Sequence, residues 1–170
     1  LPVSSRMGQW TSPLDALFTS TSATCVTGLI IADTYTNWSL FGQLVILVMI
    51  QIGGIGLMTV ISMVFIFLKK KLRMQERKVL MQAAGNLQVG GMVKLIQRIL
   101  IGTAVIETAG ALLLSIRFIP RMGLGTGIYF AIFHSISAFC NAGFDLMGKY
   151  EAFSSFTAWQ DDWLVNLTLA

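Results

Sequence analysis

The chain has 170 residues, of which 55% are hydrophobic and 12% are charged, and its mean hydropathy is +0.73. Soluble domains carry about 25% charged residues, so this composition excludes an ordinary soluble protein and indicates an integral membrane protein. The net charge of +4 does not predict nucleic-acid binding, because most basic residues form one cluster beside a predicted membrane span.

The first segment of interest, residues 13–41, recurs without gaps 115 positions later, as residues 128–156. Each copy holds a short apolar stretch, then a small and polar segment that ends in glycine, and lies beside a predicted membrane span. An internal repeat of this kind is typical of re-entrant pore loops. Ten of the 29 positions are identical, and in the first copy they are Ala16, Phe18, Ser20, Ser22, Ala23, Cys25, Gly28, Tyr35, Ser39 and Phe41.

Each copy is predicted to begin with a short helix, over residues 13–23 and 128–138. In the first copy Ser12 is a good N-cap, Pro13 suits the first helical position, and Asp15 favours the first turn. About eleven residues are too few to cross a bilayer, so these helices should enter the membrane and be followed by non-helical segments, residues 24–29 and 139–144.

The next segment, residues 41–68, carries no charge and is predicted to be a membrane span. Gly53, Gly54 and Gly56 lie near its midpoint, where they would allow either close packing against a neighbour or a bend used in gating. Close packing is the interpretation that we favour.

Residues 69–98 hold eight of the twelve basic residues, which predicts that this segment faces the cytoplasm. Binding to lipid headgroups and binding to a protein partner explain the cluster equally well. The eight residues are Lys69, Lys70, Lys71, Arg73, Arg77, Lys78, Lys94 and Arg98.

Residues 99–116 form the second predicted span, which Glu107 interrupts. A carboxylate at this depth costs roughly 2.5–3.5 kcal/mol, so Glu107 should face protein, together with Thr103 and Gly110 on the same helix face. We expect a structural role, in which Glu107 ties to a pore loop or a neighbouring helix, rather than a proton relay.

Residues 1–40 and 118–162 should then lie outside the cell or enter the membrane from outside, and residues 163–170 begin a further span. Negative charge on that side either concentrates cations or simply keeps the loops polar. The acidic residues concerned are Asp15, Asp33, Asp145, Glu151, Asp161 and Asp162.

The sequence does not predict an enzyme or a bound cofactor. His134 is the only histidine and is expected to be buried in a pore helix, while the pair Asp161 and Asp162 is typical of an exposed loop. Cys25 and Cys140 occupy equivalent positions of the repeat, but each lies in its own loop, so we do not expect a disulfide.

Glycine in both predicted loops points to cation coordination. Carbonyl oxygens that replace the hydration shell of an ion must point inward, and glycine reaches the required backbone angles without steric cost. The carboxyl end of each short helix adds partial negative charge, which favours a cation there.

Three segments, residues 21–29, 51–56 and 133–144, together resemble the Trk/Ktr potassium-uptake family, and the resemblance covers nearly the whole chain. It implies an all-α integral membrane fold with four helix–pore-loop–helix repeats of the potassium-channel-like type around one pore. Gly28 and Gly143 would be the filter glycines, and a glycine at the first position is typical of potassium-selective members. Cys140 departs from the usual asparagine. The implied filter residues are Val26, Thr27, Gly28, Leu29, Asn141, Ala142, Gly143 and Phe144.

By the same resemblance, residues 1–68 form the first repeat without its leading span, and residues 94–170 form the second repeat with the start of its trailing span. Residues 69–93 would be the cytoplasmic linker. The family also implies K⁺ as the transported ion in the cell membrane, filter loops open to the outside, a homodimer of the full subunit, and a cytosolic nucleotide-binding ring facing residues 69–78. Dependence on Na⁺ is left open.

Two alternatives stay open from the sequence. Two filter strands cannot close a four-fold site, so one alternative is a two-repeat cation channel that dimerises. The other is a membrane scaffold that transports nothing, which predicts that Gly28 and Gly143 tolerate substitution.

Overall fold

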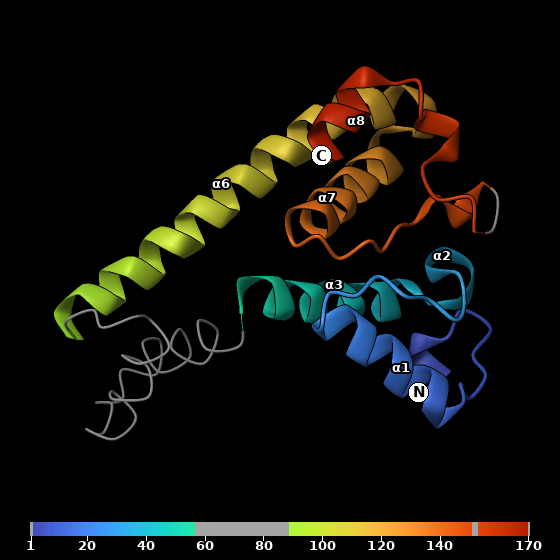
Figure 1. The fold of residues 1–170 in the computed structure, drawn as a ribbon. Coiled ribbons are helices and arrows are strands. Elements are labelled where there is room, and N and C mark those ends of the chain that lie inside the picture. The colour runs from blue at the N-terminus through green and yellow to red at the C-terminus, as the bar shows by residue number, and fades with distance from the viewer. Residues whose placement is uncertain (1, 57–88, 151–152, 170) are drawn as a thin grey trace. The chain divides into compact units, whose positions relative to one another are not determined.

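The computed structural model describes residues 2–56, 89–150 and 153–169 (Figure 1). The prediction of an all-α chain is confirmed, because these ranges contain helices, one isolated bridge between Ser5 and Trp38, and no strand. The helices are η1 (Pro2–Ser4), α1 (Pro13–Thr24), α2 (Thr34–Asn37), α3 (Leu40–Ile55), α6 (Val89–Met122), α7 (Leu124–Phe139), η2 (Met147–Lys149), η3 (Thr157–Trp159) and α8 (Trp163–Leu169).

The chain divides into two compact units, which are described separately. The first unit comprises Leu1–Gly54 and Ile106–Ala170 and contains both predicted loops. The second comprises Ile55–Val105 and includes the first half of α6. The predicted linker 69–93 lies mostly outside the described residues, as does the second half of the predicted span 41–68.

The helix α6 contains a segment, Ile96–Met122, that is long and apolar enough to cross a membrane. It extends beyond the predicted span 99–116 at both ends because the helix continues through Arg98, Arg117 and Arg121, charged residues that hydropathy excludes. The two short helices agree more closely with the sequence. Helix α1 ends one residue later than predicted, and α7 begins four residues earlier, directly after Gly123.

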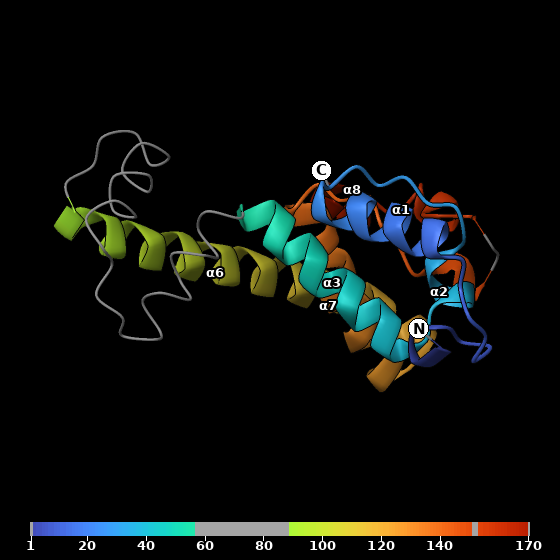
Figure 2. The ribbon, with the colours of Figure 1, turned by 90° about the horizontal axis from the view of Figure 1, so that it is seen from below.

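Helix α7 packs against the carboxyl half of α6 (Figures 1 and 2). Two glycines of the pair mark the close approach, since a Cβ on Gly127 would lie 2.8 Å from the backbone of Ile119, and one on Gly110 would lie 2.5 Å from the Ser135 hydroxyl. Small residues of this kind let membrane helices approach closely without a hydrophobic driving force.

His134 of α7 lies at the centre of an aromatic cluster. Its ring contacts four phenylalanines with ring centroids 4.8–5.8 Å apart, and the ring itself is 1% exposed. This confirms that the only histidine is buried in the second short helix. The four partners are Phe118, Phe130, Phe133 and Phe156.

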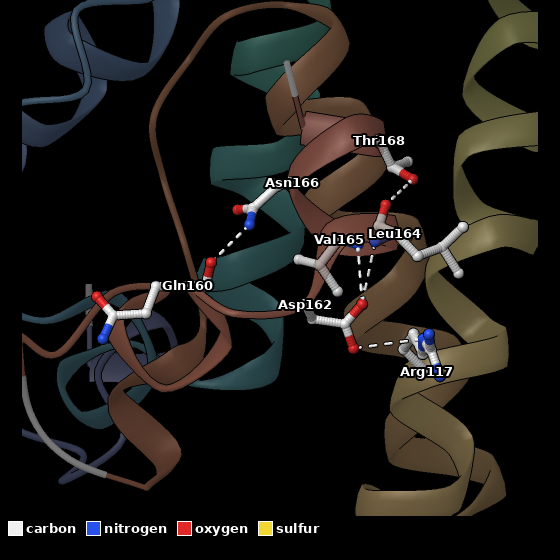
Figure 3. A network of polar contacts seen from close by, with 7 residues as sticks. All are labelled: Arg117, Gln160, Asp162, Leu164, Val165, Asn166 and Thr168. Carbon is white, nitrogen blue, oxygen red and sulfur yellow. Dashed lines mark hydrogen bonds and ion pairs between the residues drawn. The ribbon is translucent and has the colours of Figure 1, made fainter.

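The short helix α8 is fixed to α6 by Asp162 (Figure 3). One oxygen of Asp162 accepts the backbone N–H of Leu164 at 3.1 Å, and the other lies 3.3 Å from Nε of Arg117. A carboxylate at a helix start satisfies N–H groups that have no partner within the helix. Asp162 is thus part of a structural anchor, and Asp161 beside it is exposed, as expected for a loop.

Candidate functional site

The segments that follow α1 and α7 have the same backbone conformation. Gly28 and Gly143, at equivalent positions of the repeat, have φ of +72° and +70°. Two positions earlier, Val26 and Asn141 have φ of +56° and +55°. A positive φ is rare outside glycine, so agreement at two equivalent positions of each copy shows that both copies of the repeat fold into one loop type.

The hydrogen bonds of the first loop repeat in the second. The N–H of Thr27 donates to the carbonyl of Ser22 at 3.0 Å, and the N–H of Ala142 donates to that of Ser137 at 2.7 Å. Likewise the Ser22 hydroxyl donates to the carbonyl of Leu29 and the Ser137 hydroxyl to that of Phe144, at 2.7 and 2.6 Å. Each loop is therefore held to the end of its own helix in the same way.

The two loops meet at their glycines. A Cβ built on Gly28 would lie 2.8 Å from the carbonyl oxygen of Ala142 and 3.3 Å from Cα of Gly143. A Cβ built on Gly143 would lie 3.4 Å from Cα of Gly28. The structure thus brings together two segments that are 115 positions apart in sequence, and does so through backbone atoms.

The carbonyl groups of residues 26–28 and 141–143 accept no hydrogen bond from any residue that the structure describes. Backbone carbonyls are strong acceptors, and those of Thr27, Asn141 and Gly143 belong to exposed residues that water or an ion can reach. These groups are consequently available to a ligand, and a desolvated cation is the kind that carbonyl oxygens bind.

Val26 shows that the first loop is strained. A β-branched residue in the left-handed region costs on the order of 1–2 kcal/mol, whereas asparagine, its counterpart in the second loop, tolerates that region better. Strain of this kind persists only where surrounding contacts impose the conformation. We expect Val26→Asn to retain the loop and to raise the melting temperature of the purified protein; a lower melting temperature would contradict this account of Val26.

Two glycines of α3 lie against the two loops. A Cβ on Gly53 would collide with the carbonyl of Thr24 and would lie 2.9 Å from Cγ2 of Val26. A Cβ on Gly54 would collide with the thiol of Cys140. Helix α3 therefore contacts the first loop through one glycine and the second through the next, while Gly56, with φ of +91°, meets nothing within 4 Å among the described residues.

Glu107 binds α3 through Gln51. The amide nitrogen of Gln51 donates to both carboxylate oxygens of Glu107, at 2.8 and 3.0 Å. The amide oxygen of Gln51 in turn accepts the Cys140 thiol at 3.8 Å, and the Ser135 hydroxyl donates to the backbone carbonyl of Glu107 at 2.7 Å. One polar chain thus joins α6, α3 and the start of the second loop.

Removing the partner of Glu107 should destabilise the protein. Gln51→Leu leaves the carboxylate without its donor in an apolar span, and an unpaired charge there costs about 3 kcal/mol. We expect the purified variant to melt at a markedly lower temperature. Glu107→Gln, which retains a hydrogen-bonding group, should lower the melting temperature less. Equal melting temperatures of wild type and Gln51→Leu would contradict this role.

The segment after the second loop is held by His134 and carries Asp145. The backbone N–H of Leu146 donates to Nε2 of His134 at 3.0 Å, so Nδ1 carries the proton and donates to the carbonyl of Phe130 at 2.7 Å.

Burial raises the pKa of the Asp145 carboxyl above its usual range, and the N–H of Met147 opposes that shift. A cavity of about 200 Å³, lined in part by Asn141, Gly143 and Asp145, lies beside this loop.

The sequence predicted the loops but not the side chains that hold them. Cys25 and Cys140 are free thiols, at equivalent places directly after the two helices. The roles of Ser22 and Ser137 were missed, although both are identical positions of the repeat. Gln51 was also missed, and its signal was a polar side chain within a charge-free apolar segment.

Comparison with known proteins gives consistent matches. A family model described as TrkH, cation transport protein, matches residues 3–167. The chain is 47% identical over 148 residues to the potassium/sodium uptake protein NtpJ of Enterococcus hirae, and 44% identical over 149 residues to the Ktr system potassium uptake protein B of Bacillus subtilis. It is 38% identical over 170 residues to the Ktr system potassium uptake protein B of Vibrio alginolyticus. These alignments cover 87%, 86% and 100% of the chain but 33%, 32% and 36% of the relatives, so the chain spans about a third of their length.

Proposed function

The chain belongs to the TrkH family of cation transport proteins, and from this membership we propose that it forms part of the K⁺ pathway of an uptake protein in the cell membrane. Relatives that are named for potassium uptake support the choice of ion. These names also support ion transport, rather than catalysis of a chemical reaction, as the role that we propose for the site.

One observation carries the proposal. Two duplicated loops meet at Gly28 and Gly143, and the carbonyl groups of residues 26–28 and 141–143 receive no donor from the described residues. In our proposal these carbonyls coordinate K⁺, and the carboxyl ends of α1 and α7 add partial negative charge. Leu29 and Phe144 close the two filter strands, with their own carbonyls held by serine hydroxyls.

Two strands supply half of a four-fold site. Because the chain spans about a third of its relatives' length, we propose that the rest of the whole protein supplies further helix–pore-loop–helix repeats. A two-repeat channel that dimerises would also supply four filter strands, and it is the alternative that we favour less. The name "Ktr system" of the relatives indicates that the membrane subunit works with other components. A homodimer, a cytosolic nucleotide-binding ring facing residues 69–78, and filter loops open to the outside complete the proposal.

The test is rubidium uptake by the whole protein, expressed in cells that lack their own potassium uptake. The wild type is compared with Gly143→Asp and with Gly8→Asp, since Gly8 has a similar φ of +67° but lies apart from the loops. We expect uptake by the wild type and by Gly8→Asp that excess Na⁺ does not outcompete, and loss of uptake or of ion preference in Gly143→Asp. Undiminished, selective uptake by Gly143→Asp would remove the second loop from the filter and favour a scaffold.

A further inference from the structure

We propose that Ser22 and Ser137 are staples of the filter, whose hydroxyl groups set the ion preference by fixing the carbonyl that follows each filter glycine. This inference rests on the proposed function. It adds two positioning residues to it, neither of which contacts the ion.

Each serine holds its loop at two points. The carbonyl of Ser22 accepts the N–H of Thr27, the residue before Gly28, and its hydroxyl donates to the carbonyl of Leu29, the residue after Gly28. Ser137 makes the equivalent pair of bonds, to the N–H of Ala142 and the carbonyl of Phe144. Each filter glycine is therefore bracketed by two hydrogen bonds to a single residue of a rigid helix.

The staples lie in protein rather than on a surface. Ser22 and Ser137 are each 3% exposed, so water does not compete readily for their hydroxyl groups. Their bonds, at 2.7 and 2.6 Å, have the length of well-formed hydroxyl hydrogen bonds. Phe144 is 2% exposed, so its carbonyl would bear a desolvation cost without its donor, whereas Leu29 is 61% exposed and water could replace the serine there. In both loops, removal of the hydroxyl would release the residue after the filter glycine from its helix.

In the first loop a second hydroxyl group lies beside that of Ser22, and the equivalent residue of the second loop has none. The hydroxyl of Thr27 lies 2.8 Å from that of Ser22. Since the single proton of Ser22 goes to Leu29, Thr27 is the donor in this contact. In the second loop Ala142 stands at the equivalent position, so no hydroxyl of that residue donates to Ser137.

The two hydrogen bonds that flank each filter glycine should control the selectivity between ions. Discrimination between K⁺ and Na⁺ depends on the size of the carbonyl cage and on how freely its dipoles move. A loop released at one end can contract around the smaller ion. Loss of a staple should therefore change the preference between ions, whereas a purely structural serine would change only the amount of folded protein.

The experiment measures rubidium uptake by the whole protein with and without excess Na⁺, normalised to the protein present in the membrane. Ser22→Ala and Ser137→Ala are expected to lower the preference for Rb⁺ over Na⁺ about five- to tenfold, the factor that corresponds to one hydrogen bond. Ser20→Ala is the matched control, because its hydroxyl lies on the same helix and donates to the carbonyl of Leu17, outside the loop. The control should retain the wild-type preference.

The outcomes separate the staple from the filter itself. Wild-type preference in both alanine variants would overturn the staple and leave the proposed function intact. A wild type that takes up no rubidium would overturn both. If the alanine variants do not accumulate, Ser22→Cys and Ser137→Cys carry the test, since a thiol is a small but weak donor. A lowered preference in them supports the staple, and a wild-type preference overturns it.

Discussion

Gly28→Ala is expected to abolish rubidium uptake by the whole protein, while Gly143→Ala lowers it about tenfold. Both substitutions put a side chain on a left-handed backbone, with φ of +72° and +70°, at a cost of about 1–2 kcal/mol. Only at Gly28 would the new Cβ also lie 2.8 Å from a backbone oxygen of the other loop. That oxygen belongs to Ala142 and cannot move unless the two loops separate.

The order of the uptake rates among three glycine-to-alanine variants makes this prediction specific. Gly8→Ala introduces the same kind of strain, with φ of +67°, but no described residue lies within 4 Å of its new Cβ. Initial uptake rates, normalised to protein in the membrane, should therefore fall from Gly8→Ala through Gly143→Ala to Gly28→Ala. A Gly28→Ala variant that transports as well as Gly143→Ala would show that the loops do not meet as described.

Gly54→Ala is expected to lower both the melting temperature and the uptake rate, and removal of the Cys140 side chain should restore part of each. The new Cβ would lie 2.6 Å from Cβ of Cys140 and would collide with its sulfur atom. Overpacking of this kind costs typically 1–3 kcal/mol. In the double variant Gly54→Ala/Cys140→Gly the nearest atom that remains is Cα of residue 140, at 3.2 Å.

Two further variants make this prediction specific. Gly53→Ala would collide with the backbone carbonyl of Thr24, so no side-chain deletion should rescue it. Gly102→Ala is the control, because it lies in the interior of α6, no described residue lies within 4 Å of its Cβ, and alanine favours a helix there. Failure of Cys140→Gly to raise the melting temperature of Gly54→Ala would contradict the contact between α3 and the second loop.

The sequence predicted the parts of this site that depend on local chemistry and on the repeat. Pro13 and the apolar run after it mark the start of α1, and the duplication assigns the same helix and loop to α7. Glycine in both loops predicts backbone angles that cost other residues steric strain, and Gly28 and Gly143 have such angles, with φ of +72° and +70°. These features follow from short-range rules that one copy of the repeat already contains.

Other features required the packed structure. No local rule predicts a positive φ for Val26, since β-branched residues avoid that region, and the contact with α3 that accompanies it is long-range. Glu107 could be assigned to a protein-facing surface, but its partner Gln51 lies 56 positions away. The close approach of Gly28 and Gly143 depends in the same way on how α1, α3 and α7 pack.

The central claim is that the two loops coordinate K⁺ through backbone carbonyls. Anomalous scattering from crystals of the whole protein soaked in thallium or rubidium salts would test it most directly. The account predicts an anomalous peak beside Gly28 and Gly143, within coordination distance of carbonyl oxygens from residues 26–28 and 141–143, and loss of that peak in Gly28→Ala. Well-ordered loops with no peak between them, and ions bound elsewhere in the same crystal, would contradict it.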